Sequence, residues 1–178
     1  PANNTFSAFT AAVAAAQGSA TITGVYLKAG AYDWSASTNH VLTGNPVYVW
    51  AEPEAVISMP GANQTLAADL FLVRTNLWWF GGHFQNGSNV FSIRDLNTRV
   101  ERIEIEGVTG SQLGSLFYHD STTKNASADL GYVRIQHCKL DNVNSFVHVR
   151  SGTNAINSSI VADYFECSYN RVKVIDKY

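Results

Sequence analysis

Short apolar alternations separated by polar turns recur along the second half of the chain, and this recurrence limits the possible folds more than any other feature. Residues 134–150 read RIQHCKLDNVNSFVHVR, in which two apolar alternations flank a polar turn. Similar units occupy residues 77–95, 102–120 and 163–178. A β-hairpin uses such a pattern once, whereas repetition every 20–50 residues or so is typical of a solenoid whose coils stack.

Aligning these units predicts which residues lie above one another in successive coils. One predicted column holds Phe84, Val108, Leu140 and Tyr169, a second holds Gly82, Cys138 and Cys167, and a third holds Ile93, Phe117 and Val149. The two cysteines are therefore expected inside consecutive coils as small apolar residues, which is the common fate of free cysteine. Antiparallel sandwiches also contain many short strands, but they do not predict repeated strand-turn-strand units in one orientation.

The only convincing helix covers residues 5–17, where Phe6, Phe9, Val13 and Ala16 form one apolar stripe. The rest of the chain reads as short strands, such as 25–27, 47–49 and 70–73. The end of a solenoid is an exposed sheet edge, and an amphipathic helix before the first coil can cover it.

The predicted fold class is therefore all-β: a right-handed parallel β-helix with a short N-terminal capping α-helix. Residues 1–20 are expected to form the cap and residues 21–178 the β-helix. Because the last unit stops in an apolar strand, we expect the β-helix to continue beyond it or to be completed by other subunits.

Composition narrows the functional classes. With 178 residues the chain fits one domain. Its net charge of -2 gives no reason to expect nucleic acid, and no apolar run approaches the roughly 18 residues needed for membrane insertion. Two cysteines make neither a disulfide framework nor a four-ligand zinc site, and the histidines lack metal-ligand spacing. No metal or cofactor is expected.

A helix followed by GVYLKAGAYDW at 24–34 and then by repeated coils resembles the pectate-lyase-like parallel β-helix superfamily. The Gly30-Ala31-Tyr32 turn and the coil sequences LWWFGGHFQNG and VRIQHCKLDN carry this resemblance. It is nearest in style to bacteriophage tailspike proteins and bacterial polysaccharide lyases. The resemblance implies a surface that holds a long carbohydrate and, for a tailspike, a homotrimer. No catalytic motif of these proteins aligns with this chain residue by residue.

Candidate site residues follow the second strand of each unit. We expect Arg94, Tyr118, Arg150 and Lys173 to bind substrate along one outward strip, because stacked coils lie about 4.8 Å apart. Guanidinium binds carboxylate and tyrosine stacks on sugar rings, which suits an acidic polysaccharide. Trp78, expected to face outward while Trp79 faces inward, is a further candidate sugar platform or an interface residue. Against these roles, outward positions on strands must be polar in any case, and neighbouring charges pair without a ligand.

Two cleavage chemistries remain open along this strip. Hydrolysis needs two carboxylates about 5–9.5 Å apart, for which Asp95 and Asp120 are the candidates. β-Elimination needs a base and a cation beside a uronate carboxylate, for which His119 and His148 are candidate bases. Neither set has a diagnostic spacing.

The sequence therefore predicts a carbohydrate-recognising β-helix, part of a phage tailspike-like protein on the virion tail, that binds a bacterial surface polysaccharide and acts as a depolymerase. Two alternatives remain: a secreted bacterial polysaccharide lyase, and a non-catalytic adhesin or structural stalk. Oligomeric state separates the first two, and turnover of polysaccharide separates both from the third.

Overall fold

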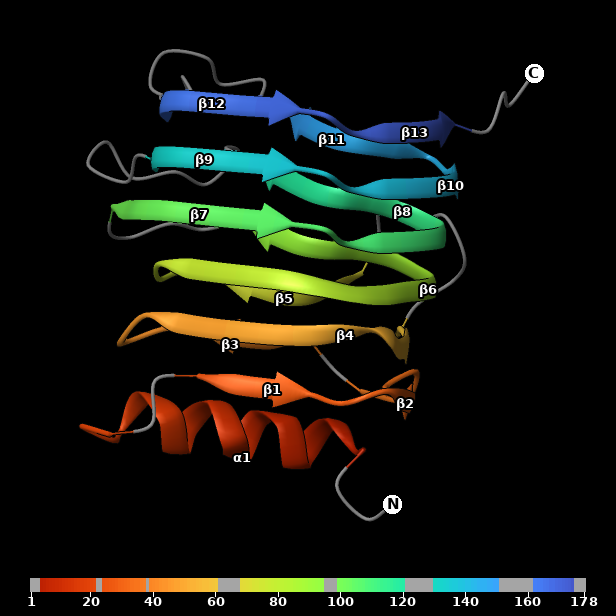
Figure 1. Ribbon diagram of the computed structural model, residues 1–178. Helices are drawn as coiled ribbons and strands as arrows, with labels where there is room; N and C mark the ends of the chain where they lie inside the picture. Colours follow the sequence, from red (N-terminus) through yellow and green to blue (C-terminus); the bar gives the residue numbers. More distant parts are fainter. Residues whose placement is uncertain are drawn as a thin grey trace.

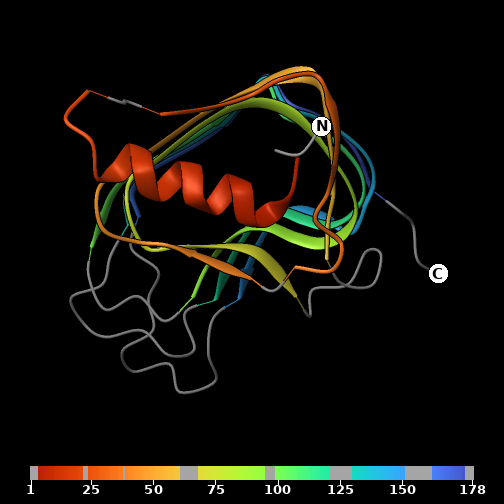
Figure 2. The ribbon, with the colours of Figure 1, turned by 90° about the horizontal axis from the view of Figure 1, so that it is seen from below.

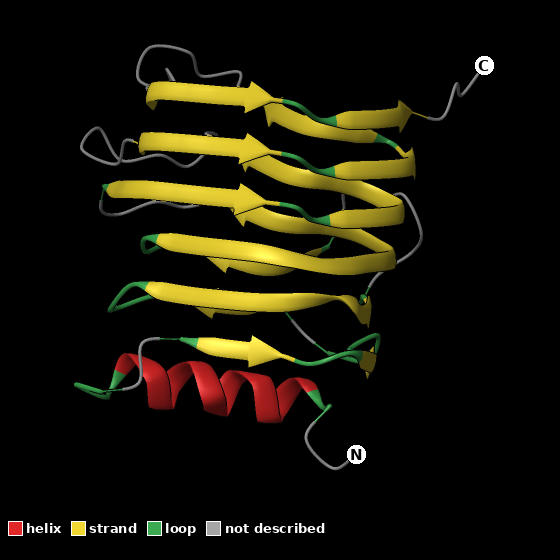
Figure 3. Cartoon of the chain, in the orientation of Figure 1, coloured by secondary structure: helices red, strands yellow, loops and turns green. Residues whose placement is uncertain are grey.

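In the computed structural model the described residues form one helix followed by a parallel β-solenoid, which confirms the predicted β-helix with its short N-terminal helix (Figure 1). The right-handed sense stays a prediction. The described residues are 4–21, 24–37, 39–60, 68–94, 99–120, 130–150 and 162–174. Figure 3 shows the strands stacked one above another with turns at shared corners.

Helix α1 (Phe6–Gln17) lies across the first coil at one end of the solenoid (Figure 2). The Thr5 side chain caps its start by accepting a hydrogen bond from the backbone N–H of Ala8. Phe9 and Val13 are its buried residues, and Phe6 packs edge-on against Trp34 at 5.2 Å between ring centroids. The apolar stripe predicted from the sequence is thus the face that covers the solenoid interior.

The described strands lie in three parallel ladders. The first ladder joins β1 (Val25–Leu27), the start of β4 (Val47–Ser58), the start of β6 (Leu77–Ile93), β7 (Val100–Glu106), β9 (Leu130–Gln136) and β12 (Ala162–Ser168). The second ladder joins β2 (Gly30–Asp33), later parts of β4 and β6, the start of β8 (Thr109–Asp120), β10 (Lys139–Val143) and β13 (Arg171–Val174). The third joins β3 (His40–Leu42), β5 (Asp69–Val73), the ends of β6 and β8, and β11 (Ser145–Arg150).

The core changes character along the solenoid. Near α1 it is aromatic, with Trp34, Phe71, Trp79, Phe84 and Phe91 almost wholly buried and in ring contact. Farther along the solenoid, the first-ladder core positions are aliphatic: they hold Ile103, Ile105, Val133 and Ile135, all fully buried. In β12 the same positions hold Phe165 and Cys167, which are exposed.

The predicted columns were correct for some coils and wrong for others. Phe84 and Leu140 do share a column, because each pairs with Gly110. Val108 and Tyr169 do not belong to it: the residues stacked there are Gly110 and Val172. Gly110 can occupy this inward position because the Leu113 side chain fills the space, lying 2.7 Å from where a Cβ would be.

The third predicted column was also displaced. Ile93 and Val149 both pair with His119, whereas Phe117 pairs with Phe91 and Val147. A shift of two residues leaves a side chain on the same face of its strand, so alternation alone does not detect it.

The stacked cysteines were predicted incorrectly. Cys138 is buried, as expected, but Cys167 pairs with Ile135 and is exposed. The position corresponding to Cys138 in the last coil is taken by Asn170, whose side chain accepts a hydrogen bond from the Cys138 N–H at 2.9 Å.

Candidate functional site

The predicted third-ladder residues do come together, but the aromatic ring among them is covered. Tyr118 pairs with His148, and their rings stack at 5.1 Å with planes 3° apart. The Arg94 guanidinium lies 4.4 Å from the centroid of the same ring. Tyr118 is only 2% exposed. The predicted stacking of this tyrosine on a sugar ring therefore has no open ring face in this arrangement.

Arg94 is held by a carboxylate that the sequence analysis did not select. Its Nε lies 2.8 Å from the Asp69 carboxylate, which is buried. Asp69 also accepts hydrogen bonds from Asn89 at 2.9 Å and Ser92 at 2.6 Å. This buried ion pair gives Arg94 a structural partner, since a buried carboxylate needs charge-paired and hydrogen-bonded neighbours. The available signal was Asp69 at the start of the otherwise apolar segment DLFLV.

Of the remaining third-ladder candidates, one is buried and three have side chains outside the described part of the structure. His119 is 5% exposed and lies in register with Ile93, so the expectation that it joins an exposed strip was wrong. Asp120 and Arg150 are adjacent in the β8–β11 pairing, but their side chains lie outside the described part of the structure. Asp95 also lies outside the described residues. The catalytic roles of His119, His148, Asp95 and Asp120 stay predictions.

Lys173 was placed on the wrong face by the sequence analysis. It belongs to the second ladder, where it pairs with Asp141, and their charged groups lie 3.5 Å apart. Both side chains are well exposed. The predicted single strip is therefore split between two faces of the solenoid.

The outward side of the first ladder carries a row of aromatic residues, which we call the aromatic strip. Its members are Tyr26, Tyr48, Trp50, Trp78, Phe80, Tyr132 and Tyr164. The predicted orientation of the tryptophan pair is confirmed, because Trp79 is fully buried against Phe84 whereas Trp78 is only partly buried. Of the strip, only Trp78 is predicted from the sequence as a binding residue.

Parallel in-register pairing stacks these rings along the solenoid. Tyr48 and Trp78 lie 4.5 Å apart with planes 8° apart, and Tyr132 and Tyr164 lie 5.0 Å apart with planes 4° apart. Within a stack, each ring covers part of the face of its neighbour. Tyr164 is 50% exposed and Trp50 is 41% exposed, so both rings keep accessible surface.

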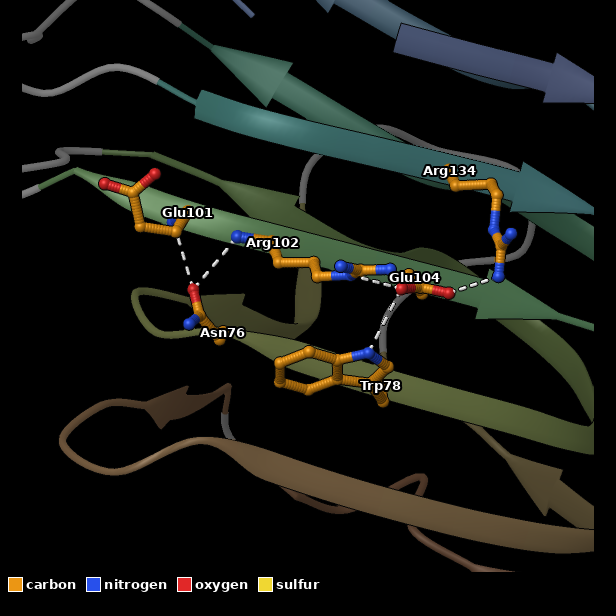
Figure 4. Close-up of polar contacts among 6 residues, drawn as sticks. All are labelled: Asn76, Trp78, Glu101, Arg102, Glu104 and Arg134. Carbon is orange, nitrogen blue, oxygen red and sulfur yellow. Dashed lines mark hydrogen bonds and ion pairs between the residues drawn. The ribbon is translucent and has the colours of Figure 1, made fainter. Parts of the chain in front are cut away.

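A buried carboxylate lies between the two halves of the strip. Glu104 is 4% exposed and receives hydrogen bonds from Arg102, Arg134 and the indole N–H of Trp78, the last at 3.2 Å (Figure 4). Arg102 also lies over the Tyr132 ring, with its guanidinium 5.0 Å from the ring centroid. Glu104 thereby links strands β6, β7 and β9.

The electrostatics keep Glu104 ionised. Burial acts to raise the pKa of Glu104, but the hydrogen bond from Arg102 and the charges of Arg134 and Arg102 outweigh it, so the pKa is lowered. Beside it, the Asn76 side chain accepts hydrogen bonds from the backbone N–H groups of Glu101 and Arg102, each at 3.0 Å (Figure 4). These contacts fix the backbone from which Arg102 projects.

The first-ladder face as a whole is acidic. Its strand stretches contain five acidic residues, Glu101, Glu104, Glu106, Asp163 and Glu166, and two basic residues, Arg102 and Arg134. The formal balance is 2 − 5 = −3, and both arginines already contact a carboxylate. This face is therefore unsuited to a polyanion.

Comparisons with family models, with curated proteins and with solved structures find no match for this chain. Among the described residues, no helix has the length and apolar character required to cross a membrane. The same described ranges contain no group of three or more His, Cys, Asp or Glu side chains arranged to hold a metal ion.

Proposed function

We propose that the first-ladder face binds an extended, uncharged polysaccharide through the aromatic strip. The observation that carries this proposal is the row of partly exposed aromatic rings held at fixed spacing on a rigid ladder. Aromatic side chains combine a large apolar contact area with little conformational entropy to lose on binding. A ligand with repeating units matches a surface with repeating side chains.

Charge favours a neutral chain over an acidic one. A formal balance of −3 on this face repels polyanions, and Arg102 and Arg134 are committed to Glu104. An acidic polymer would have to displace a buried carboxylate before it could use these guanidinium groups. The acidic polysaccharide expected from Arg94, Tyr118 and Arg150 would concern the third ladder, where Arg94 is engaged by Asp69.

Binding without cleavage is the activity we assign to the strip. Glu104 is an ion-paired carboxylate with a lowered pKa, so it holds no proton to give to a glycosidic oxygen near neutral pH. The depolymerase part of the proposal rests on the third-ladder candidates His148, Asp120 and Asp95. The wider setting we propose is that of a tailspike-like homotrimer on a virion, with a secreted polysaccharide lyase as the alternative.

Affinity measurements with soluble polysaccharides test the binding proposal. A panel of neutral and acidic polymers would be titrated against the unmodified protein and against Trp50→Ala and Tyr164→Ala. Each variant is expected to bind a neutral polymer roughly tenfold more weakly, equivalent to about 1.4 kcal/mol. Val41→Ala is the matched control, because Val41 is an exposed apolar residue on β3 of the third ladder.

The results of these titrations, together with assays for cleavage of the polymer, distinguish the proposed functions. Tight binding of acidic polymers alone, or unchanged binding by both aromatic variants, would refute the role of the strip. New reducing ends without unsaturated uronate would indicate a hydrolase, and both signals together a lyase. Retention of a polymer without any cleavage leaves the non-catalytic adhesin reading.

A further inference from the structure

A pocket of about 490 Å³ lies between α1 and the first two coils. Val13, Val25 and Val47 are almost completely buried and contribute its apolar lining, and the exposed Trp50 forms part of its wall. Its other lining residues are Ala16, Gln17, Ser19, Asn45, Pro46 and Tyr48. None of these side chains is charged, so the pocket suits an uncharged ligand.

The position of Trp50 depends on a residue with no side chain. Gly24 precedes Val25, which pairs with Val49, so Gly24 lies beside Tyr48 at the start of the first ladder. A Cβ at Gly24 would lie 2.5 Å from Cζ3 of Trp50. Any larger residue at 24 would push the indole away from this place. Trp50 also lies parallel to Tyr48, with planes 14° apart, so two rings of the strip form a continuous wall of the pocket.

Amide groups are fixed where the helix meets the turn before β4. The Gln17 side-chain N–H groups donate to the backbone carbonyls of Thr43, at 2.9 Å, and Asn45. In return, the Asn45 side chain donates to the Gln17 carbonyl at 2.8 Å. These reciprocal bonds hold the end of α1 to the first coils and give the pocket polar groups in fixed positions.

We propose that this pocket receives the terminal sugar residue of the polysaccharide bound on the aromatic strip, and that this residue is a 6-deoxyhexose, whose C6 is a methyl group. The proposal rests on the proposed function, because Tyr48 and Trp50 belong to both the strip and the pocket. A chain lying along the strip reaches the pocket at the α1 end of the first ladder.

The apolar lining of the pocket favours a methyl group over a hydroxymethyl group at C6 of the sugar. Against the three valines, a hydroxymethyl group would lose its hydrogen bonds to water and gain none, whereas a methyl group would gain apolar contact. Gln17, Ser19 and Asn45 are the polar residues of the lining beside which the ring hydroxyls would lie. The expected selectivity is roughly tenfold in favour of the methyl-bearing sugar.

The first test uses the unmodified protein and two small glycosides. Saturation-transfer NMR and titration would compare a methyl 6-deoxyhexoside with the methyl glycoside of the corresponding hexose. Saturation is expected to be strongest at the C6 methyl protons, and the deoxyhexoside is expected to bind roughly tenfold more tightly. Equal binding of the two glycosides, or saturation confined to the other side of the sugar, would overturn the proposal.

The second test fills the pocket from the helix. Ala16→Phe places a ring in the space, whereas Ala15→Phe places the same ring on an adjacent exposed position of α1. Ala16→Phe is expected to abolish binding of the deoxyhexoside and to weaken binding of a polymer that ends in it; Ala15→Phe is expected to change neither.

The two proposals fail in different ways. If the polymer binds and Trp50→Ala weakens it while Ala16→Phe does not, the strip binds the chain and the pocket inference is wrong. If the small glycoside is bound in the pocket but no polymer is bound, the proposed function is wrong. Binding of an apolar peptide in place of either glycoside would also overturn the inference.

Discussion

The Glu104 cluster offers the most direct quantitative prediction. Glu104→Gln keeps the shape of the side chain and one carbonyl oxygen, but it removes the negative charge that Arg102 and Arg134 contact. These arginine side chains are 50% and 30% exposed, so water rehydrates them when the charge is lost. We therefore take the low end, about 1.5 kcal/mol, for each of the two charge-assisted hydrogen bonds.

The sum is about 3 kcal/mol, and a neutral bond to the glutamine oxygen recovers about 1 kcal/mol, leaving a loss of about 2 kcal/mol. For a chain of this length, that corresponds to a fall of about 4–8 °C in the thermal midpoint. Glu101→Gln is the control, because Glu101 is 63% exposed and contacts only Arg99 among the charged side chains described around it. Its loss should stay below about 0.5 kcal/mol.

The contribution of Glu104 to the free energy of unfolding should decrease as the pH falls. Because the folded-state pKa of Glu104 is lowered, its contribution is present above the unfolded value near 4.5 and is lost as pH falls through the folded value. Thermal unfolding of both variants from pH 7 to pH 3 measures this directly. The difference between Glu104→Gln and the unmodified protein should shrink below pH 4.5. Equal midpoints at pH 7, or a difference that persists unchanged in acid, would refute this account of the cluster.

Three further results are expected. Trp79→Ala should lower the unfolding free energy in urea by about 3–5 kcal/mol, because Trp79 is fully buried among phenylalanine rings; a loss under 1 kcal/mol would contradict this. Iodoacetamide at pH 8 should modify the exposed Cys167 long before Cys138, because burial raises the pKa of the Cys138 thiol to about 12; mass spectrometry would show the order, and prior labelling of Cys138 would be inconsistent with it. Gly81→Ala should destabilise more than Gly44→Ala in the same urea assay, because both have positive φ but only at Gly81 would a Cβ lie 2.2 Å from a carbonyl oxygen; equal losses would contradict the close approach.

The fold could be predicted because the alternation of apolar and polar residues repeats from coil to coil even where the residue identities differ. Alternation marks which side chains point inward, and a helix with one apolar stripe before the first strand indicates a cap. Alternation does not give the offset between coils, so Val108 was displaced by two residues from Gly110, which actually pairs with Leu140. An inward glycine carries no apolar signal, and only the neighbouring Leu113 explains it.

Corner geometry accounts for the larger error in the last coil. At the corner between the first and second ladders, Gly81, Gly107, His137 and Tyr169 all have positive φ, from 54° to 76°. Glycine is expected in this conformation, whereas histidine and tyrosine give no comparable signal. Tyr169 was therefore assigned to a strand column although it occupies the turn.

The candidate site was harder to predict than the fold because it depends on contacts across coils. Asp69 and Arg94 are 25 residues apart, and only the stacking of β5 beside β6 brings them together. Likewise, Tyr48 and Trp78 become one stack through register, not through proximity in sequence. A composition rich in aromatics indicates that such contacts exist but does not assign them to a face.

The change from an aromatic to an aliphatic core implies that local stability differs along the solenoid. In a solenoid each coil is stabilised mainly by its neighbours, so local stability follows local packing. The rings near α1 are buried and in contact with one another, while Phe165 and Cys167 in β12 are core positions in contact with water. Among the coils that the structure describes, local opening should therefore require less free energy at β12 than in the coils that hold the buried rings.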